Sequence, residues 1–132
     1  MKLTIYLLSS IHAILFANAS ASERCYDSEK SSQNISNCLK VELKDADKIL
    51  NSEYKELMNR VRTDYVNSPD LGAKLKSHIK KSQIAWLEVR DENCFIESFF
   101  VDPTAQIYEA ITNSCKARES NARSSYLRKL KF

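Results

Sequence analysis

The sequence predicts an all-α protein, a small antiparallel bundle of three main helices with a short N-terminal segment and two disulfides. The 132 residues contain one glycine, Gly72, and two prolines, Pro69 and Pro103, so few positions interrupt a helix. Apolar residues recur at intervals of three and four rather than two over long stretches. Four cysteines follow a segment typical of exported proteins, and thiols that leave the cytoplasm become disulfides.

Residues 1–21 have the pattern of a signal peptide. Lys2 supplies the positive charge, and Leu3 to Phe16 form an apolar stretch shorter than the roughly 20 residues of a membrane span. A buried N-terminal helix is the alternative. Ala-x-Ala sequences end at Ala19 and at Ala21, and we expect cleavage after Ala21. Residues 22–132 would then form one periplasmic or secreted domain, with no membrane attachment once the signal is removed.

The first main helix has the most regular apolar stripe. Its members step by three or four residues for about eight turns: Ile35, Leu39, Leu43, Ala46, Leu50, Tyr54, Leu57, Val61 and Tyr65. Asn67-Ser68-Pro69-Asp70 ends this run and starts the second helix. Ser68 is the expected N-cap, Pro69 the first helical residue, and Asp70 lies near the positive end of the helix dipole.

The second and third helices have less regular stripes. The inward face of the second is expected to carry Leu71, Leu75, Ile79, Trp86, Val89 and Cys94. Asp102-Pro103 repeats the cap-then-proline signal and should start the third helix. Its expected inward residues are Ile107, Ile111, Cys115, Ala122, Tyr126 and Leu130. Such helices bury their stripes only against one another, which predicts a bundle with short connections.

The chain has four cysteines: Cys25, Cys38, Cys94 and Cys115. They allow three disulfide pairings, and the favoured one joins the first to the second and the third to the fourth. A zinc site is the alternative, but structural zinc ligands usually stand two to four residues apart and no two of these cysteines do. The last two cysteines lie at unequal distances from the Asp102 turn. Their bridge therefore requires non-helical chain between Phe95 and Gln106.

Charge argues against nucleic acid as a partner. The chain has 20 basic and 17 acidic residues, and Lys2 would be removed with the signal peptide. The remaining 19 basic and 17 acidic residues give a net charge of only about +2. Basic residues gather near the C-terminus, where cations suit a helix end and a solvated face. They are Lys116, Arg118, Arg123, Arg128, Lys129 and Lys131.

Beyond the four cysteines, seven residues at characteristic spacing carry a resemblance to a known family: Leu50, Asn51, Tyr54, Gln83, Trp86, Arg90 and Asp91. With the cysteines they match, in order, the pattern of the lysozyme-inhibitor LprI-type N-terminal family, and the chain resembles that family over essentially all of residues 22–132. The resemblance implies an exported, helical, disulfide-bonded bacterial protein, in a family named for members that inhibit lysozyme. Relatives often carry glycine between the last two cysteines, where this chain has Phe99-Phe100-Val101-Asp102-Pro103. The shape of this loop therefore does not follow from the resemblance.

The central motif residues also have a physical interpretation. Gln83, Trp86 and Arg90 lie at i, i+3 and i+7 on one helical face. Trp86 is expected in the core, with its indole N–H donated to a polar side chain such as that of Asn51 or Tyr54.

Arg90 and Asp91 are adjacent, so we expect them to point apart, toward separate partners on neighbouring helices, rather than to pair. A structural role is the first interpretation of the motif. The alternative is that Arg90 or Asp91 edges a groove that receives a partner.

The resemblance favours a protein-binding function, inhibition of a lysozyme-type muramidase by blockage of its cleft. The candidate binding loop runs from Phe95 to Thr104 and presents Phe99, Phe100 and Asp102. The alternative for the two phenylalanines is a place in the core. The second function that the residues allow is a periplasmic immunity, adaptor or assembly protein with a different envelope partner.

No catalytic, metal or cofactor site is expected. His78 is the one imidazole left after cleavage, and its neighbours Lys76 and Lys80 are typical of a solvated face. Bonded cysteines offer no nucleophilic thiol. The spacing of the carboxylates Asp91 and Glu97 does not differ from chance in so charged a chain. The sequence leaves the oligomeric state open.

Overall fold

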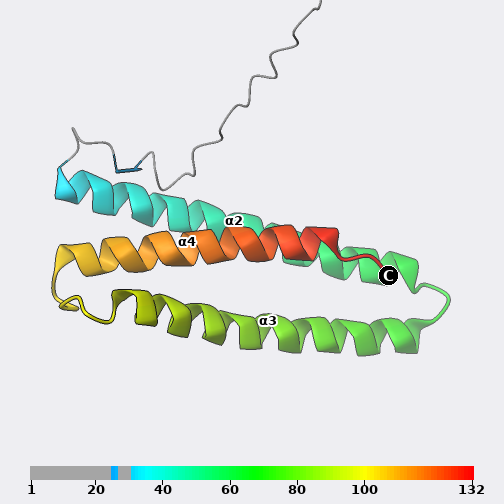
Figure 1. Cartoon of the computed structure of the whole chain (residues 1–132). Coiled ribbons are helices and arrows are strands. Elements are labelled where there is room, and N and C mark those ends of the chain that lie inside the picture. Colours follow the sequence, from blue (N-terminus) through cyan, green and yellow to red (C-terminus); the bar gives the residue numbers. More distant parts are fainter. Residues whose placement is uncertain (1–24, 27–30) are drawn as a thin grey trace, which may run out of the picture.

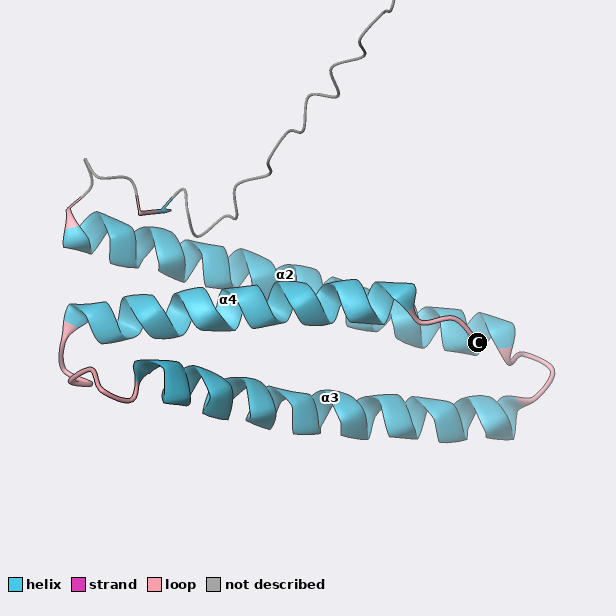
Figure 2. Ribbon diagram, in the orientation of Figure 1, coloured by secondary structure: helices cyan, strands magenta, loops and turns pink. Residues whose placement is uncertain are grey.

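The structure, a computed structural model, describes Cys25, Tyr26 and residues 31–132, and three helices make up most of this part (Figure 1). α2 spans Ser32–Asp64, α3 spans Pro69–Ser98 and α4 spans Gln106–Lys129. Short loops join them (Figure 2). The predicted all-α bundle is therefore confirmed. The predicted signal peptide, residues 1–21, lies outside the described residues, as does most of the expected short N-terminal segment.

The order of the helices makes α2 and α4 parallel neighbours, with α3 antiparallel to both (Figure 1). α4 packs most extensively against α2, whereas α3 makes fewer contacts with either helix. No helix in the described ranges has an apolar stretch long enough to cross a membrane.

α2 follows its predicted stripe throughout. All nine predicted residues are buried or half-buried, and Leu39, Leu57 and Val61 are fully buried. The helix begins after Ser31, whose Oγ accepts a hydrogen bond from the backbone N–H of Asn34 at 3.3 Å. A sequence with one regular stripe thus forms one 33-residue helix.

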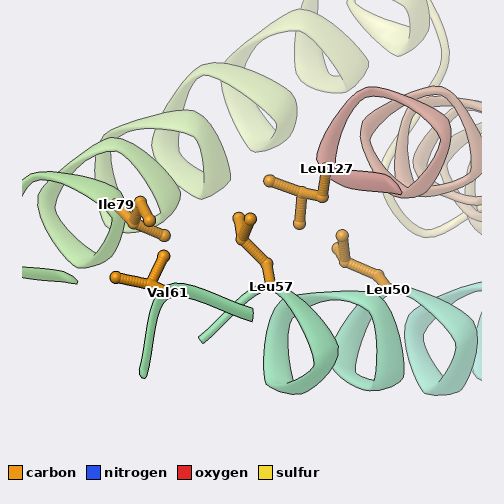
Figure 3. Packing of buried hydrophobic residues seen from close by; sticks show 5 residues of the cluster. All are labelled: Leu50, Leu57, Val61, Ile79 and Leu127. Atoms are coloured by element: carbon orange, nitrogen blue, oxygen red, sulfur yellow. The ribbon is translucent and has the colours of Figure 1, made fainter. Parts of the chain in front are cut away.

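The main hydrophobic core cluster draws on all three helices (Figure 3). Its buried members are Leu50, Leu57, Val61, Ile79 and Leu127. Burial of side chains of this size stabilises the fold by about 1.5–3 kcal/mol each. A smaller cluster of Cys25, Leu39 and Ala110 lies toward the start of α2 and α4. The core is narrow, as expected for a three-helix protein of this length.

The predicted stripe of α3 is partly wrong. Leu71 and Val89 are each 55% exposed, whereas Gly72 and Arg90 are buried and Gln83 is half-buried. The inward face keeps helical spacing, but a glycine and two polar residues occupy places on it. A hydrophobic pattern does not identify a glycine or a polar residue as inward-facing. The predicted stripe therefore contained their apolar neighbours instead.

The predicted stripe of α4 is also partly wrong, since Ile107, Ala122 and Tyr126 are exposed. The fully inward positions are instead mostly small. They are Ala110, Cys115, Ala117, Ser120, Ser124 and Leu127. Small side chains let two helix backbones approach closely, which explains why α4 packs more closely on α2 than α3 does.

The start of α3 has the predicted Pro69 at its first turn and Ser68 at the N-cap, although the Ser68 side chain makes no capping hydrogen bond. One turn later, Gly72 lies against the end of α2. A Cβ built on Gly72 would lie 2.9 Å from Cβ of Tyr65. The glycine is therefore required by the close approach of the two helices.

Replacing Gly72 with alanine creates an overpacked contact that is expected to cost about 1–3 kcal/mol, since the two helices must separate there. Alanine gains roughly 1 kcal/mol over glycine from helix propensity, so the free energy of unfolding is expected to fall by up to about 2 kcal/mol. Urea unfolding followed by circular dichroism measures the change. The control is Ser77→Ala, an exposed site on the same helix, and a stabilised Gly72→Ala protein would contradict the packing argument.

Candidate partner-binding turn and motif cluster

Two disulfides lie toward the same end of the bundle. Cys25 is bonded to Cys38 with a Cα–Cα distance of 5.7 Å, and Cys94 to Cys115 with a distance of 5.6 Å. The favoured pairing is confirmed. Residues 99–105, between α3 and α4, supply the non-helical chain that the second bridge requires. Since all four cysteines are bonded, none is available as a zinc ligand or a nucleophile.

Asp102 shapes the turn between α3 and α4. Its Oδ1 accepts hydrogen bonds from the backbone N–H of Thr104 at 2.8 Å and from the Thr104 hydroxyl at 2.7 Å. Both hydrogen bonds hold the pKa of Asp102 below its ordinary value, and the bond from the backbone N–H has the larger effect. The predicted role of Asp102 in starting the third helix is wrong, because α4 begins later, with Ala105 at the cap position. Asp102 stabilises an Asx-type turn instead.

Aromatic rings project from this end of the bundle. Phe99 is 62% exposed and Phe100 is 97% exposed, so the alternative that they are core residues is wrong. Phe95, Phe99 and Phe100 stack edge to face in sequence, with ring centroids 5.8 Å and 5.3 Å apart. We call these three residues the aromatic turn. Its rings form an apolar surface on the segment that the Cys94–Cys115 disulfide closes.

The motif residue Arg90 joins the three helices. Its Nη1 donates to Oδ1 of Asp47 on α2 and to Oγ of Ser120 on α4, both at 2.9 Å. The Ser120 hydroxyl in turn donates to Asp47 at 2.8 Å. Arg90 is only 9% exposed, so its charge depends on these partners. The first interpretation of the motif, a structural role, agrees with this geometry.

Arg90 also pairs with its neighbour Asp91, contrary to expectation. Nε of Arg90 lies 3.1 Å from Oδ1 of Asp91, because the long arginine stem can bend back along its own helix. Asp91 has the expected partner on another helix as well, Nζ of Lys116 at 3.2 Å. Burial works to raise the pKa of Asp91, but the hydrogen bonds from Lys116 and Arg90 outweigh it, and the pKa lies below its ordinary value.

Trp86 is half-buried and packs against the main core cluster, as predicted, and two guanidinium groups lie near its ring. The Cζ atoms of Arg90 and Arg123 each lie 5.5 Å from the ring centroid. The expected bond from the indole to Asn51 or Tyr54 does not form within the described part of the chain. Gln83, one turn before Trp86, accepts a hydrogen bond from Nε of Arg123 at 3.0 Å. Trp86 thus packs α3 against α4 through cation–π contacts.

A hollow of about 300 Å³ lies between α2 and α3 beside this cluster. Five motif residues line it: Leu50, Asn51, Tyr54, Gln83 and Arg90. The motif therefore gathers at one place in the folded chain although its members come from two helices. Arg90 borders a groove, as the second interpretation requires, whereas Asp91 is not part of the lining.

The described residues contain no group of three or more His, Cys, Asp or Glu side chains that could hold a metal. The two carboxylates considered as an acid-base pair are each bound to α4, Asp91 to Lys116 and Glu97 to Arg118. His78 is exposed.

The fold and its bridges define a class, small three-helix proteins closed by two disulfides, which is typical of proteins outside the cytoplasm. The model of the family described as "Lysozyme inhibitor LprI" matches residues 25–127, and the chain belongs to this family. The crystal structure of a DUF1311 family protein from Pseudomonas putida KT2440 is similar at 30% identity and a TM-score of 0.67. The match covers 77% of this chain and 94% of that one. No curated protein matched the chain.

Proposed function

We propose that this protein is an exported inhibitor that blocks the cleft of a lysozyme-type muramidase with its aromatic turn. The observation that carries the proposal is the 97% exposure of Phe100 on a loop closed by the Cys94–Cys115 disulfide. A loop that is ordered before binding loses little conformational entropy when it binds. The name of the family supports lysozyme as the partner.

The chemistry of such a cleft fits this surface. Muramidases of this type bind sugar rings in a groove and cleave with two carboxyl groups. Aromatic rings can occupy the places of sugar rings, and buried aromatic anchors supply much of the affinity of an interface.

Substituting Phe99 and Phe100 together with serine is expected to weaken inhibition about a hundredfold, through the loss of two anchor rings. Turbidity of cell walls treated with lysozyme measures the effect across a range of inhibitor concentrations. The matched control is Val66→Ser, which removes a 71% exposed apolar side chain from the loop between α2 and α3, at the other end of the bundle.

Two outcomes would contradict the proposal in different ways. Unchanged lysis in the presence of excess oxidised wild-type protein would exclude lysozyme inhibition and favour an immunity, adaptor or assembly role with another envelope partner. Full inhibition by the double serine variant would retain the function but exclude the aromatic turn as the contact surface.

A further inference from the structure

A row of lysines along α2 has no part in the inhibition proposed above. Lys44, Lys48 and Lys55 line a hollow of about 590 Å³ on this helix. They are spaced by four and seven residues, which puts them on one side of the helix. The hollow between α2 and α3 shares Asp47 and Asn51 with this one. The two hollows thus adjoin, and we call them together the basic groove.

The positive charge of the basic groove is uncompensated. Lys80 adds a fourth cation from α3, and none of the four lysines has an ion pair or hydrogen bond within the described residues. The carboxylate that lines both hollows, Asp47, already accepts hydrogen bonds from Arg90 and Ser120. The groove therefore attracts anions.

Three of the C-terminal basic residues differ from these lysines. Lys116, Arg118 and Arg128 each pair with a carboxylate on another helix. The bundle thus uses these cations for its own contacts and leaves the lysines of the basic groove free for a ligand.

Uncharged groups in the basic groove indicate which class of anionic ligand is complementary to it. The Asn51 amide and the Tyr54 hydroxyl have no hydrogen-bond partner among the described residues, and both can donate and accept. Ile84 and Leu87 add exposed apolar surface on the α3 side. A sugar ring has hydroxyl and amide groups at its edge and an apolar face, so it is complementary to this combination.

We propose that the basic groove binds an acidic glycan, a sugar strand that carries carboxylates. Lys44 and Lys55 lie about 16 Å apart along α2 at 1.5 Å per residue, a length that suits a strand better than a single small anion. The uncharged donors and apolar side chains beside these cations favour a sugar over an anionic membrane surface. The aromatic turn lies at the end of the bundle, so the two surfaces can act independently.

Sedimentation with insoluble peptidoglycan sacculi tests the proposal on the oxidised chain. Wild-type protein is expected to sediment with sacculi, and K44Q/K48Q/K55Q is expected to bind roughly tenfold more weakly. The control variant K74Q/K81Q/K131Q removes the same charge at exposed sites outside both hollows and should bind as wild type does. Lys80→Glu, a change on the other helix, should also weaken binding.

The nature of the ligand is tested with two further probes. Sacculi whose carboxylates have been amidated should not retain the protein, and phosphatidylglycerol vesicles should bind it less than native sacculi do. Equal losses in the two triple variants, full binding to amidated sacculi, or a preference for vesicles would each overturn the proposal. K44Q/K48Q/K55Q should still inhibit lysozyme on a soluble N-acetylglucosamine oligomer, so failure here is distinct from failure of the proposed inhibition.

Discussion

Reduction of both disulfides is expected to lower the free energy of unfolding by about 6 kcal/mol, roughly 3 kcal/mol for each bridge. The bridges close loops of 13 and 21 residues, and their loss restores conformational freedom to the unfolded chain. Domains of this size are typically stable by only about 5–15 kcal/mol. Urea unfolding followed by circular dichroism, with and without reductant, measures the change.

The two bridges are expected to differ in their effect on the aromatic turn. Cys94→Ser with Cys115→Ser removes the bridge that closes the loop, so inhibition should weaken together with stability. Cys25→Ser with Cys38→Ser removes a bridge confined to the start of α2, so the folded fraction should still inhibit. Unfolding curves that coincide for oxidised and reduced protein would contradict the assigned role of the bridges.

Replacing Asp47 with alanine is expected to destabilise the protein by about 1–3 kcal/mol, because the buried Arg90 loses its partner on α2 and keeps Asp91 and Ser120. Thermal and urea unfolding measure the loss. The matched control is Asp45→Ala, which removes an exposed carboxylate two positions away on the same helix. It should change stability by less than about 0.5 kcal/mol.

A double variant separates the buried charge from other causes. Combining Asp47→Ala with Arg90→Met removes both charges and should recover part of the stability lost in Asp47→Ala alone. Strictly additive losses would mean that the ion pair between α2 and α3 contributes nothing, and that Asp47 acts through some other contact.

The sequence predicts the elements of this fold better than the faces that the elements bury. The stripe of α2 is apolar and regular, and all of its predicted members are buried or half-buried. In α3 and α4 the inward positions include Gly72, Arg90 and Ser120, whose burial depends on close backbone contact or on partners from other helices. Such partners are distant in the sequence, and hydrophobic periodicity carries no information about them.

The candidate surfaces were predictable to different degrees. The aromatic turn could be located, because Phe99 and Phe100 break the helical period between two cysteines, but only the folded chain decides that they are exposed. The spacing of Lys44, Lys48 and Lys55 is visible in the sequence, but spacing alone does not distinguish these lysines from those of an ordinary solvated face. Whether a lysine has a carboxylate partner depends on which helix lies beside it. Only the folded structure shows which helices lie beside each face of α2.

The position of the bridges has a consequence for cleavage of the backbone. One bridge lies within the first 38 residues and the other joins α3 to α4, so no covalent bond other than the main chain connects α2 to the rest of the bundle. A single nick between residues 65 and 68 would yield two peptides that separate under denaturing conditions without reductant. A nick between residues 99 and 105 would leave every fragment linked through sulfur, so the proposed inhibitory end would survive proteolysis as one covalent unit.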